Sequence, residues 1–441
     1  MKPFHKLLSV RLVGWSVSGA ASHAVFGAIT TIVLARGLGP EGLGAYGVFL
    51  AVAFLLNQLG SLGLGTAYVR LATPQFQAAS EVRTVSWTFF YARGFAVGGL
   101  AILALLSGEL ANRMFAGAGA VRAYLLPGVA AAVLMAVGDH YSEVLRARLA
   151  HRSAATVRAV MAAARTLAYL TLLSVDALTV SSAITAAVLL VAVESGTLAT
   201  LGHRGVQLWP PVRPQLRREW IALSWWLFLT SATTALLTHT DTLLLATLGG
   251  SAETGLWVAA SRLVSPIPLL VGALWSVVLP ISMALTDPGK LERYLAWSGH
   301  TAVVSLALAA VGTLIVGPIV TLLFGDSYVS AIAAAQWLLV GFGLNVAAVL
   351  YGGLIHRLGL ERALAGLSVV LLIGNGIGDL VLIPLYGAAG CAAVTTAVMF
   401  VGAAWTVWRV ERARETLLTE VPPPSNGPER ITDGNTMPTE P

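Results

Sequence analysis

The sequence consists of long apolar stretches separated by short polar connections. Twelve stretches recur, and each has at least the roughly 20 residues that a helix needs to cross a bilayer. They cover residues 12–35, 43–69, 84–107, 121–145, 154–175, 179–202, 220–248, 254–285, 295–323, 331–355, 363–384 and 388–409. Because backbone polar groups inside lipid must be satisfied within the chain, these stretches predict transmembrane α-helices.

The longest internal polar connection, with Pro210, Pro211 and Pro214, divides the stretches six and six. A shift of 211 residues also aligns the halves, since it places Leu34, Ala35, Gly39, Gly44 and Tyr46 on Leu245, Ala246, Gly250, Gly255 and Trp257. Six is an even number, so both halves begin on the same side of the membrane, which predicts a pseudo-twofold axis along the membrane normal. The predicted fold is an all-α integral membrane protein with about twelve transmembrane helices in two six-helix bundles.

The expected domains follow from this division. They are a six-helix bundle at 1–202, a cytoplasmic linker at 203–219, a second six-helix bundle at 220–409 and a tail at 410–441. The tail turns polar and proline-rich, and such a segment buries too little apolar surface to fold, so it is expected to be disordered.

Composition and charge support a membrane location. Hydrophobic residues make up 56% of the chain and charged residues 11%, whereas about a quarter of a soluble domain is charged. Of the Lys and Arg residues in loops and at the ends of the apolar stretches, only Arg36, Arg113 and Arg122 are on the predicted external side, while nineteen lie in predicted cytoplasmic loops and flanks. This bias predicts an inner-membrane protein with both termini in the cytoplasm. The basic residues form no single tract, so no nucleic-acid partner is expected.

Motifs for enzymatic chemistry are absent from the sequence. The single Cys391 forms neither an internal disulfide nor a cysteine metal cluster, and there is no HExxH, CxxC or GxxxxGK[ST] pattern. The glycines Gly60, Gly63 and Gly65 favour close helix packing over a dinucleotide fold. We therefore expect no cofactor, no metal and no enzymatic activity.

Several charged residues fall within the predicted spans, where each needs a partner or a wet cavity. The arginines Arg93, Arg165 and Arg262 are candidates for a substrate cavity, because guanidinium groups bind phosphate oxygens bidentately. The alternative for Arg165 is a structural ion pair with Glu194 on the next span. Arg262 and Asp241 lie at similar depths on sequence-adjacent spans, which predicts a pair that is either static or opened by an anionic substrate.

Other polar residues are candidates for coupling or packing. Glu194, His239 and Asp241 are possible ion or proton sites, although a lone histidine near a helix end is more often a packing residue. Asn345 is a candidate for the cavity, where its amide would bind sugar or bond between helices. Pro266 and Pro268 predict a kink directly after Arg262.

Four segments carry motifs in an order typical of one family. The first segment, residues 34–70, is similar to an L-GPE-G-Y segment with a GLG-x-A-x-x-R ending and reads LARGLGPEGLGAYGVFLAVAFLLNQLGSLGLGTAYVR. The second, residues 240–263, is similar to a D-x-x-x-L…G…G-Y-x-A-x-R-L segment and reads TDTLLLATLGGSAETGLWVAASRL. The third, residues 322–331, is similar to an LFG-x-x-Y loop and reads LLFGDSYVSA. The fourth, residues 374–396, is similar to an L-IP-x-x-G-x-x-G-A-A ending and reads GNGIGDLVLIPLYGAAGCAAVTT. The chain thus resembles the polysaccharide-repeat-unit flippases of the multidrug/oligosaccharidyl-lipid/polysaccharide exporter superfamily.

The resemblance implies two bundles that form a V around a central cavity and work by alternating access. The implied cargo is an undecaprenyl-diphosphate-linked oligosaccharide for cell-surface polysaccharide biosynthesis. The implied partners are this lipid-linked oligosaccharide, membrane lipids, and polysaccharide polymerase and glycosyltransferases. Asp241 and Arg262 match positions typical of the family, whereas Arg93 and Arg165 rest on the depth argument alone.

Three alternatives stay open at this stage. A proton- or sodium-coupled drug or metabolite exporter of the same superfamily would use Asp241, His239 or Glu194 as its ion site. A membrane-bound glycosyltransferase or polymerase would need a large loop or soluble domain, but the longest internal loop covers only 203–219. A non-transporting scaffold leaves the many charges within the spans without a purpose.

Overall fold

The computed structural model describes residues 11–61, 65, 68, 82–114, 119–148, 150–203, 214–285 and 287–419. Within these ranges the chain is helical and contains no strand. The α-helices are α2 (Arg11–Gly60), α4 (Val82–Met114), α5 (Gly119–Ala147), α6 (His151–Ser174), α7 (Val180–His203), α8 (Pro214–Leu248), α9 (Gly250–Val264), α10 (Pro266–Ala284), α11 (Pro288–Phe324), α12 (Ala331–Arg357), α13 (Glu361–Arg412) and α14 (Arg414–Thr419). A short 3₁₀ helix, η2, covers Asp326–Tyr328.

Most of these helices are long and apolar enough to span a membrane. Among the described residues, eight helices meet this condition, and α9 with α10, bent by 45°, make a ninth. Two of the eight contain a non-helical residue between two expected spans, namely Gly39 in α2 and Gly387 in α13. Eleven of the twelve expected stretches begin on a helix, the sixth begins one residue before α7, and α8 carries the seventh. The chain is a multi-pass, all-α membrane protein, as the sequence predicts.

The two kinks have local causes. Gly39 has φ 67°, a left-handed conformation that glycine adopts readily, and Pro40 follows it. Gly387 has φ 57°, and its successor Ala388 donates its backbone N–H to Glu253 Oε2 at 2.7 Å. The carboxylate of α9 thus caps the second half of α13 as an N-cap side chain would.

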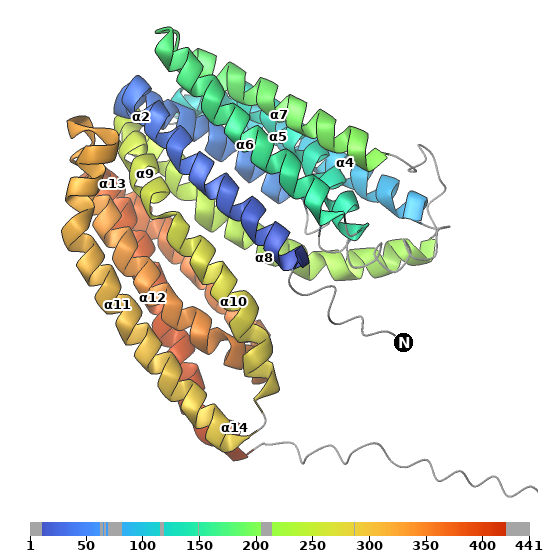
Figure 1. Ribbon diagram of the computed structural model, residues 1–441, viewed down its shortest axis with the longest axis vertical. Helices are drawn as coiled ribbons and strands as arrows, with labels where there is room; N and C mark the ends of the chain where they lie inside the picture. Colours follow the sequence, from blue (N-terminus) through green and yellow to red (C-terminus); the bar gives the residue numbers. More distant parts are fainter. Residues whose placement is uncertain are drawn as a thin grey trace, which may run out of the picture.

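Two lobes form a V, as Figure 1 shows. The first contains α2 and α4–α7, the second contains α9–α13, and α8 contacts α2 and α5 of the first and α9 and α13 of the second. One apolar core spans both lobes where they meet, and includes Leu34, Tyr46, Trp257, Tyr328 and Cys391. Toward the other end of the V each lobe has its own core, one around Tyr141 and one around Tyr351. We call these the closed end and the open end.

At the closed end the lobes meet in a nearly symmetric contact. A Cβ on Gly44 would overlap the carbonyl oxygen of Ser251, and a Cβ on Gly255 would overlap that of Pro40. The shift of 211 residues that relates Gly44 to Gly255 also relates Pro40 to Ser251. It further relates residues with positive φ, since Gly39 (67°) matches Gly250 (85°) and Asp176 (55°) matches Gly387 (57°). The predicted internal repeat is thus visible in the backbone, and the pseudo-twofold axis passes between α2 and α9.

Side chains also join the lobes at this end. Arg36 donates from Nε to the carbonyl oxygen of Leu323 at 2.8 Å and from Nη2 to that of Leu322 at 2.6 Å. Tyr328, on η2, donates its hydroxyl to the carbonyl oxygen of Ala35 at 3.1 Å. These carbonyls lie at a kink and at a helix end, where intrahelical bonds are missing.

The domain boundaries differ in detail from the expectation. Residues 214–219, expected in the linker, already belong to α8, while 204–213 lie outside the described residues. Residues 410–419 of the expected tail are helical, and Val410 and Leu417 are buried in the core of the second lobe. The apolar side chains within this segment explain why it folds despite its polar surroundings. Residues 420–441 are outside the described part.

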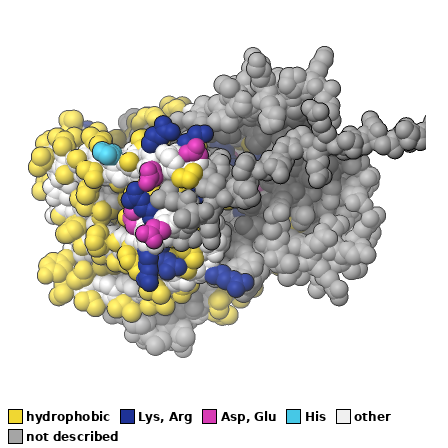
Figure 2. Space-filling view, turned by 90° about the horizontal axis from the view of Figure 1, so that it is seen from below, with side chains coloured by type: hydrophobic (Ala, Val, Ile, Leu, Met, Phe, Trp, Pro, Cys, Tyr) yellow, Lys and Arg dark blue, Asp and Glu magenta, His cyan; other side chains and the backbone are white. Residues whose placement is uncertain are grey.

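The open end of the second lobe carries charged side chains framed by apolar ones (Figure 2). The exposed charged residues of α11, α13 and α14 in this region are Lys290, Glu292, Arg293, Arg362, Glu411, Arg412, Arg414 and Glu415. Such a polar end is typical of helices that leave the lipid for water.

Replacement of Gly44 or Gly255 by leucine should separate the lobes at the closed end, because the added side chain overlaps backbone atoms that cannot move aside. We expect a longer distance between spin labels on Asp176→Cys and Asp326→Cys, measured by double electron–electron resonance. Gly99→Leu is the control, since a Cβ there meets nothing within 4 Å. An unchanged distance in both glycine variants contradicts the assigned role of this contact.

Candidate functional site

A cavity lies on the first lobe and reaches α9 of the second. Its walls come from α2, α5, α6, α7 and α9. The lining residues are Gly27, Thr30, Thr31, Leu34, Leu43, Tyr46, Phe49, Leu50, Ala53, Phe54, Ala131, Met135, Ala162, Arg165, Ala187, Val191, Val258 and Arg262. Most are apolar, and the charged members of this set are both arginines, Arg165 and Arg262. Two cationic groups on an otherwise apolar wall suit an anion that carries an apolar group.

The side chain of Arg262 is exposed where it lines the cavity. The backbone breaks just beyond it, because α9 ends at Val264 and Pro266 begins α10. Ser265 donates its hydroxyl to the carbonyl oxygen of Arg262 at 2.7 Å, which satisfies an acceptor at the helix end. The kink that the prolines predict is therefore present, and it follows the arginine directly.

The expected pair of Arg262 with Asp241 is not formed, since no ion pair joins these two described residues. Asp241 is buried and accepts hydrogen bonds instead from Asn375 Nδ2 at 2.7 Å and from Thr395 Oγ1 at 3.1 Å. It therefore faces α13, on the side of α8 that packs within the second lobe. The two residues have similar depths, but their helices point them in different directions.

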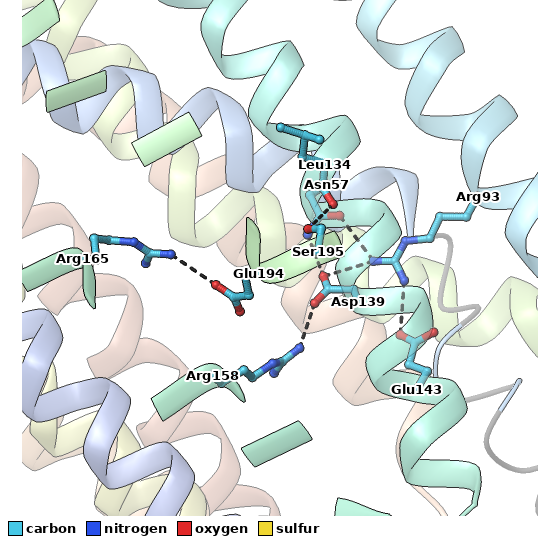
Figure 3. Close-up of polar contacts among 9 residues, drawn as sticks. All are labelled: Asn57, Arg93, Leu134, Asp139, Glu143, Arg158, Arg165, Glu194 and Ser195. Carbon is cyan, nitrogen blue, oxygen red and sulfur yellow. Dashed lines mark hydrogen bonds and ion pairs between the residues drawn. The ribbon is translucent and has the colours of Figure 1, made fainter. Parts of the chain in front are cut away.

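Arg165 pairs with Glu194, as the alternative expectation had it. The distance from Arg165 Nη2 to Glu194 Oε2 is 3.3 Å, and both side chains are 22% exposed. Nearby, Tyr46 and Tyr169 share a hydrogen bond of 2.8 Å between their hydroxyl groups. Arg165 thus both lines the cavity and has a carboxylate partner (Figure 3).

Arg93 lies away from this cavity. Its guanidinium group contacts Asp139 Oδ2 at 3.2 Å, Glu143 Oε1 at 3.2 Å and Asn57 Oδ1 at 3.3 Å, and its side chain is 5% exposed. Asp139 also pairs with Arg158 at 2.9 Å. Arg93 is not among the residues that line this cavity. Two carboxylates of α5 balance the charge that seemed unpaired on its own span, and Asn57 of α2 accepts a hydrogen bond from it (Figure 3).

A second polar cluster is buried in the second lobe. Asn375 Nδ2 bridges Asp241 Oδ1 at 2.7 Å and Asp379 Oδ2 at 3.1 Å. One ligand atom each from Asp241, Asp379 and Cys391 lies within 4.8 Å of the others. Two adjacent buried carboxylates are stable only if they hold a proton or a cation. The oxygen donors fit a hard cation, while the thiol adds little to such a site.

This cluster was only partly foreseen. The sequence singles out Asp241, but its single cysteine gives no reason to expect a metal site. The sequence also places Asp379 within a span and predicts that Asn375 bonds between helices, but it does not join them to Asp241. Their spacing of four residues, which puts them on one helix face, is the signal that links them, and Thr395 comes from the other half of α13. Asp379 Oδ1 is buried without a hydrogen-bond partner among the described residues, so the donor set has a free ligand atom.

The remaining candidates lie elsewhere. The ring of His239 stacks on Phe54, a cavity residue, with the ring centres 5.9 Å apart and the planes at 9°. Asn345 is half-buried on α12 and is not among the residues that line the cavity. The structure therefore brings Arg165 and Arg262 together, places His239 behind Phe54, and separates Arg93, Asp241 and Asn345 from them.

Comparison with known proteins decides the family. The model of a family described as "Polysaccharide biosynthesis protein" matches residues 9–285. The chain belongs to the polysaccharide biosynthesis protein family. No curated protein matches the sequence. The family match covers the first lobe together with α8, α9 and α10, and therefore includes both arginines of the cavity.

Solved structures with the same fold are transporters of lipids and drugs. A structure titled "Lipid II flippase MurJ, inward closed conformation" has a TM-score of 0.73 at 14% identity, over 92% of this chain and 90% of that one. An inward-facing multidrug resistance MATE family transporter of the MOP superfamily has 0.68 at 18%, over 90% and 95%. An outward-facing transporter of that family has 0.56 at 17%, over 90% and 93%. This polysaccharide biosynthesis family member thus has the two-lobed fold of that superfamily, as the resemblance implied.

The different surroundings of Arg93 and Arg262 lead to different expectations for their variants. Arg93→Ala leaves Glu143, whose side chain is 16% exposed, without its paired cation and leaves Asp139 with Arg158 alone. Removing one partner of a buried ion pair costs about 3 to 5 kcal/mol. We expect a lower melting temperature of the purified protein, measured by tryptophan fluorescence. Arg262→Ala should melt close to the wild type, because its side chain is exposed to the cavity. Equal melting temperatures for all three proteins contradict the structural role of the Arg93 network.

Proposed function

We propose that this protein is a flippase that moves an undecaprenyl-diphosphate-linked oligosaccharide across the cytoplasmic membrane for cell-surface polysaccharide biosynthesis. The observation that carries the proposal is the cavity in which Arg165 and Arg262 are the charged lining residues. Their guanidinium groups would bind the diphosphate, since these groups match phosphate oxygens bidentately and stay ionised. The membership in the polysaccharide biosynthesis family and the fold shared with a lipid II flippase support the same cargo class.

Orientation and partners complete the proposal. The excess of Lys and Arg in alternate loops supports a cytoplasmic location for both termini, and the open end of the V would then be cytoplasmic. The conformation described would then receive the headgroup from the inner leaflet. Release at the other leaflet requires the contact of Gly44 with Ser251 to open and the open end to close. Membrane lipids surround the protein, and glycosyltransferases and a polymerase would act before and after it, without enzymatic chemistry by this chain.

The cluster of Asp241, Asn375, Asp379 and Thr395 suits a role in coupling. A proton or a sodium ion bound there would neutralise the two carboxylates, and its release would leave two like charges buried together. Such a change in charge can favour one arrangement of α8 and α13 over another, because the two helices contact each other through these residues. We therefore assign the coupling role to this cluster in preference to Glu194 and His239.

A drug or metabolite exporter of the same superfamily is the second candidate. The coupling cluster and the likeness to MATE transporters favour it. The cavity separates the two candidates, because two arginines repel a cationic drug and attract an anionic headgroup.

Arg262→Ala and Arg165→Ala should each reduce flipping at least tenfold, since each removes a phosphate ligand whose loss costs more than about 1.4 kcal/mol. The measurement is the transfer of a fluorescent lipid-linked oligosaccharide between leaflets of proteoliposomes. Arg293→Ala, at an exposed position on α11, should keep wild-type activity. Full activity in both cavity variants excludes the proposed headgroup site.

Asp241→Asn and Asp379→Asn should abolish the dependence of flipping on an imposed sodium or proton gradient, because a neutral amide cannot balance the charge of the ion. The rate without a gradient should change less. The same proteoliposomes, with sodium and pH gradients imposed one at a time, identify the ion. If both variants respond to gradients as the wild type does, coupling takes place elsewhere.

A further inference from the structure

Two arginines on one face of α6 are each held by a carboxylate from a neighbouring helix. Arg158 and Arg165 are seven residues apart, which is about 10 Å along the helix axis. Arg158 Nη2 lies 2.9 Å from Asp139 Oδ1 on α5, and Arg165 Nη2 lies 3.3 Å from Glu194 Oε2 on α7. Figure 3 shows these four side chains as neighbours, with Glu194 lying between Arg165 and Arg158.

Arg158 and Arg165 lie one after the other along the path from the open end of the V to the closed end. Leu173, at the far end of α6, and Leu178, in the connection to α7, lie next to Gly37 beside the kink of α2, so that end of α6 belongs to the closed end. Arg158 is therefore nearer the open end, and Arg165 is deeper and lines the cavity with Arg262. An anionic headgroup that enters from the open end would meet Arg158 first, then Arg165 and Arg262.

The two ion pairs are more exposed than the Arg93 network and have fewer contacts. Arg93 is 5% exposed and has three acceptors. In contrast, Arg158 and Asp139 are 32% and 34% exposed, Arg165 and Glu194 are both 22% exposed, and each pair has one N···O contact. Partly exposed pairs contribute about 0 to 1 kcal/mol, which a bidentate phosphate contact can exceed.

We propose that Asp139 and Glu194 are exchangeable counter-ions that occupy Arg158 and Arg165 until the diphosphate of the cargo displaces them. The displaced carboxylates stay beside the arginines and compete for them again, which lowers the affinity for the headgroup and promotes its release. This inference rests on the proposed function, since it assumes an anionic headgroup. It adds that acidic residues of the first lobe set how tightly the headgroup is held.

The test is binding of farnesyl diphosphate, a short lipid diphosphate, to the purified full-length protein by isothermal titration calorimetry. Glu194→Gln removes the competing charge and keeps the shape of the side chain. We expect its affinity for the probe to rise about two- to fivefold, the factor that corresponds to an ion pair of up to about 1 kcal/mol. Asp139→Asn should raise the affinity in the same direction, and Glu194→Asp should stay close to the wild type.

Glu143→Gln is the matched control, because this carboxylate pairs with Arg93 outside the cavity and should leave the affinity unchanged. An unchanged or weaker affinity in Glu194→Gln overturns the counter-ion role, while Arg262-dependent binding by the wild type keeps the proposed function intact. If neither the wild type nor Glu194→Gln binds the probe, both proposals fail together. Should Glu194→Gln not fold, judged by its melting temperature, Glu194→Ala decides the question by the same criterion, since it also removes the competing charge beside Arg165.

Discussion

The cost of placing charge inside a membrane is the constraint on which this structure depends. An arginine at membrane depth needs either a close set of acceptors or a wet surface, and this protein contains both solutions. Arg93 is enclosed by Asp139, Glu143 and Asn57, whereas Arg262 reaches an exposed cavity wall. The first arrangement ties α4 to α5 and α2. The second keeps a cation available, which is the condition for recognising an anion.

The closed end shows how two lobes can be held together and still come apart. The contact between α2 and α9 is made by backbone at Gly44 and Gly255, and a few hydrogen bonds from Arg36 and Tyr328 to carbonyl oxygens support it. No described ion pair joins the lobes there. Helices that meet through small residues approach closely without interlocked side chains. Separation of the lobes would break this backbone contact and divide the apolar core that the two lobes share.

The sequence predicted the helices and the repeat well, because apolar length and glycine position are local properties. The kinks at Gly39 and Gly387 and the break at Pro266 all coincide with residues that disfavour a continuous helix. The arrangement of the site was harder to predict. Depth along a helix can be counted from the sequence, but rotation about its axis cannot, so Asp241 was expected opposite Arg262 and instead faces Asn375. The partners of Arg93 were not predicted for the same reason, since they come from other helices.

One pair of equivalent positions in the internal repeat differs in charge. A shift of 211 residues carries Thr30, which lines the cavity and shares a 2.8 Å hydrogen bond with Thr166, onto Asp241 in the acidic cluster. One copy of the duplicated unit thus has a neutral hydroxyl where the other has a carboxylate. Equivalent places in the two bundles therefore differ in charge, although the helices that carry them are related by the repeat.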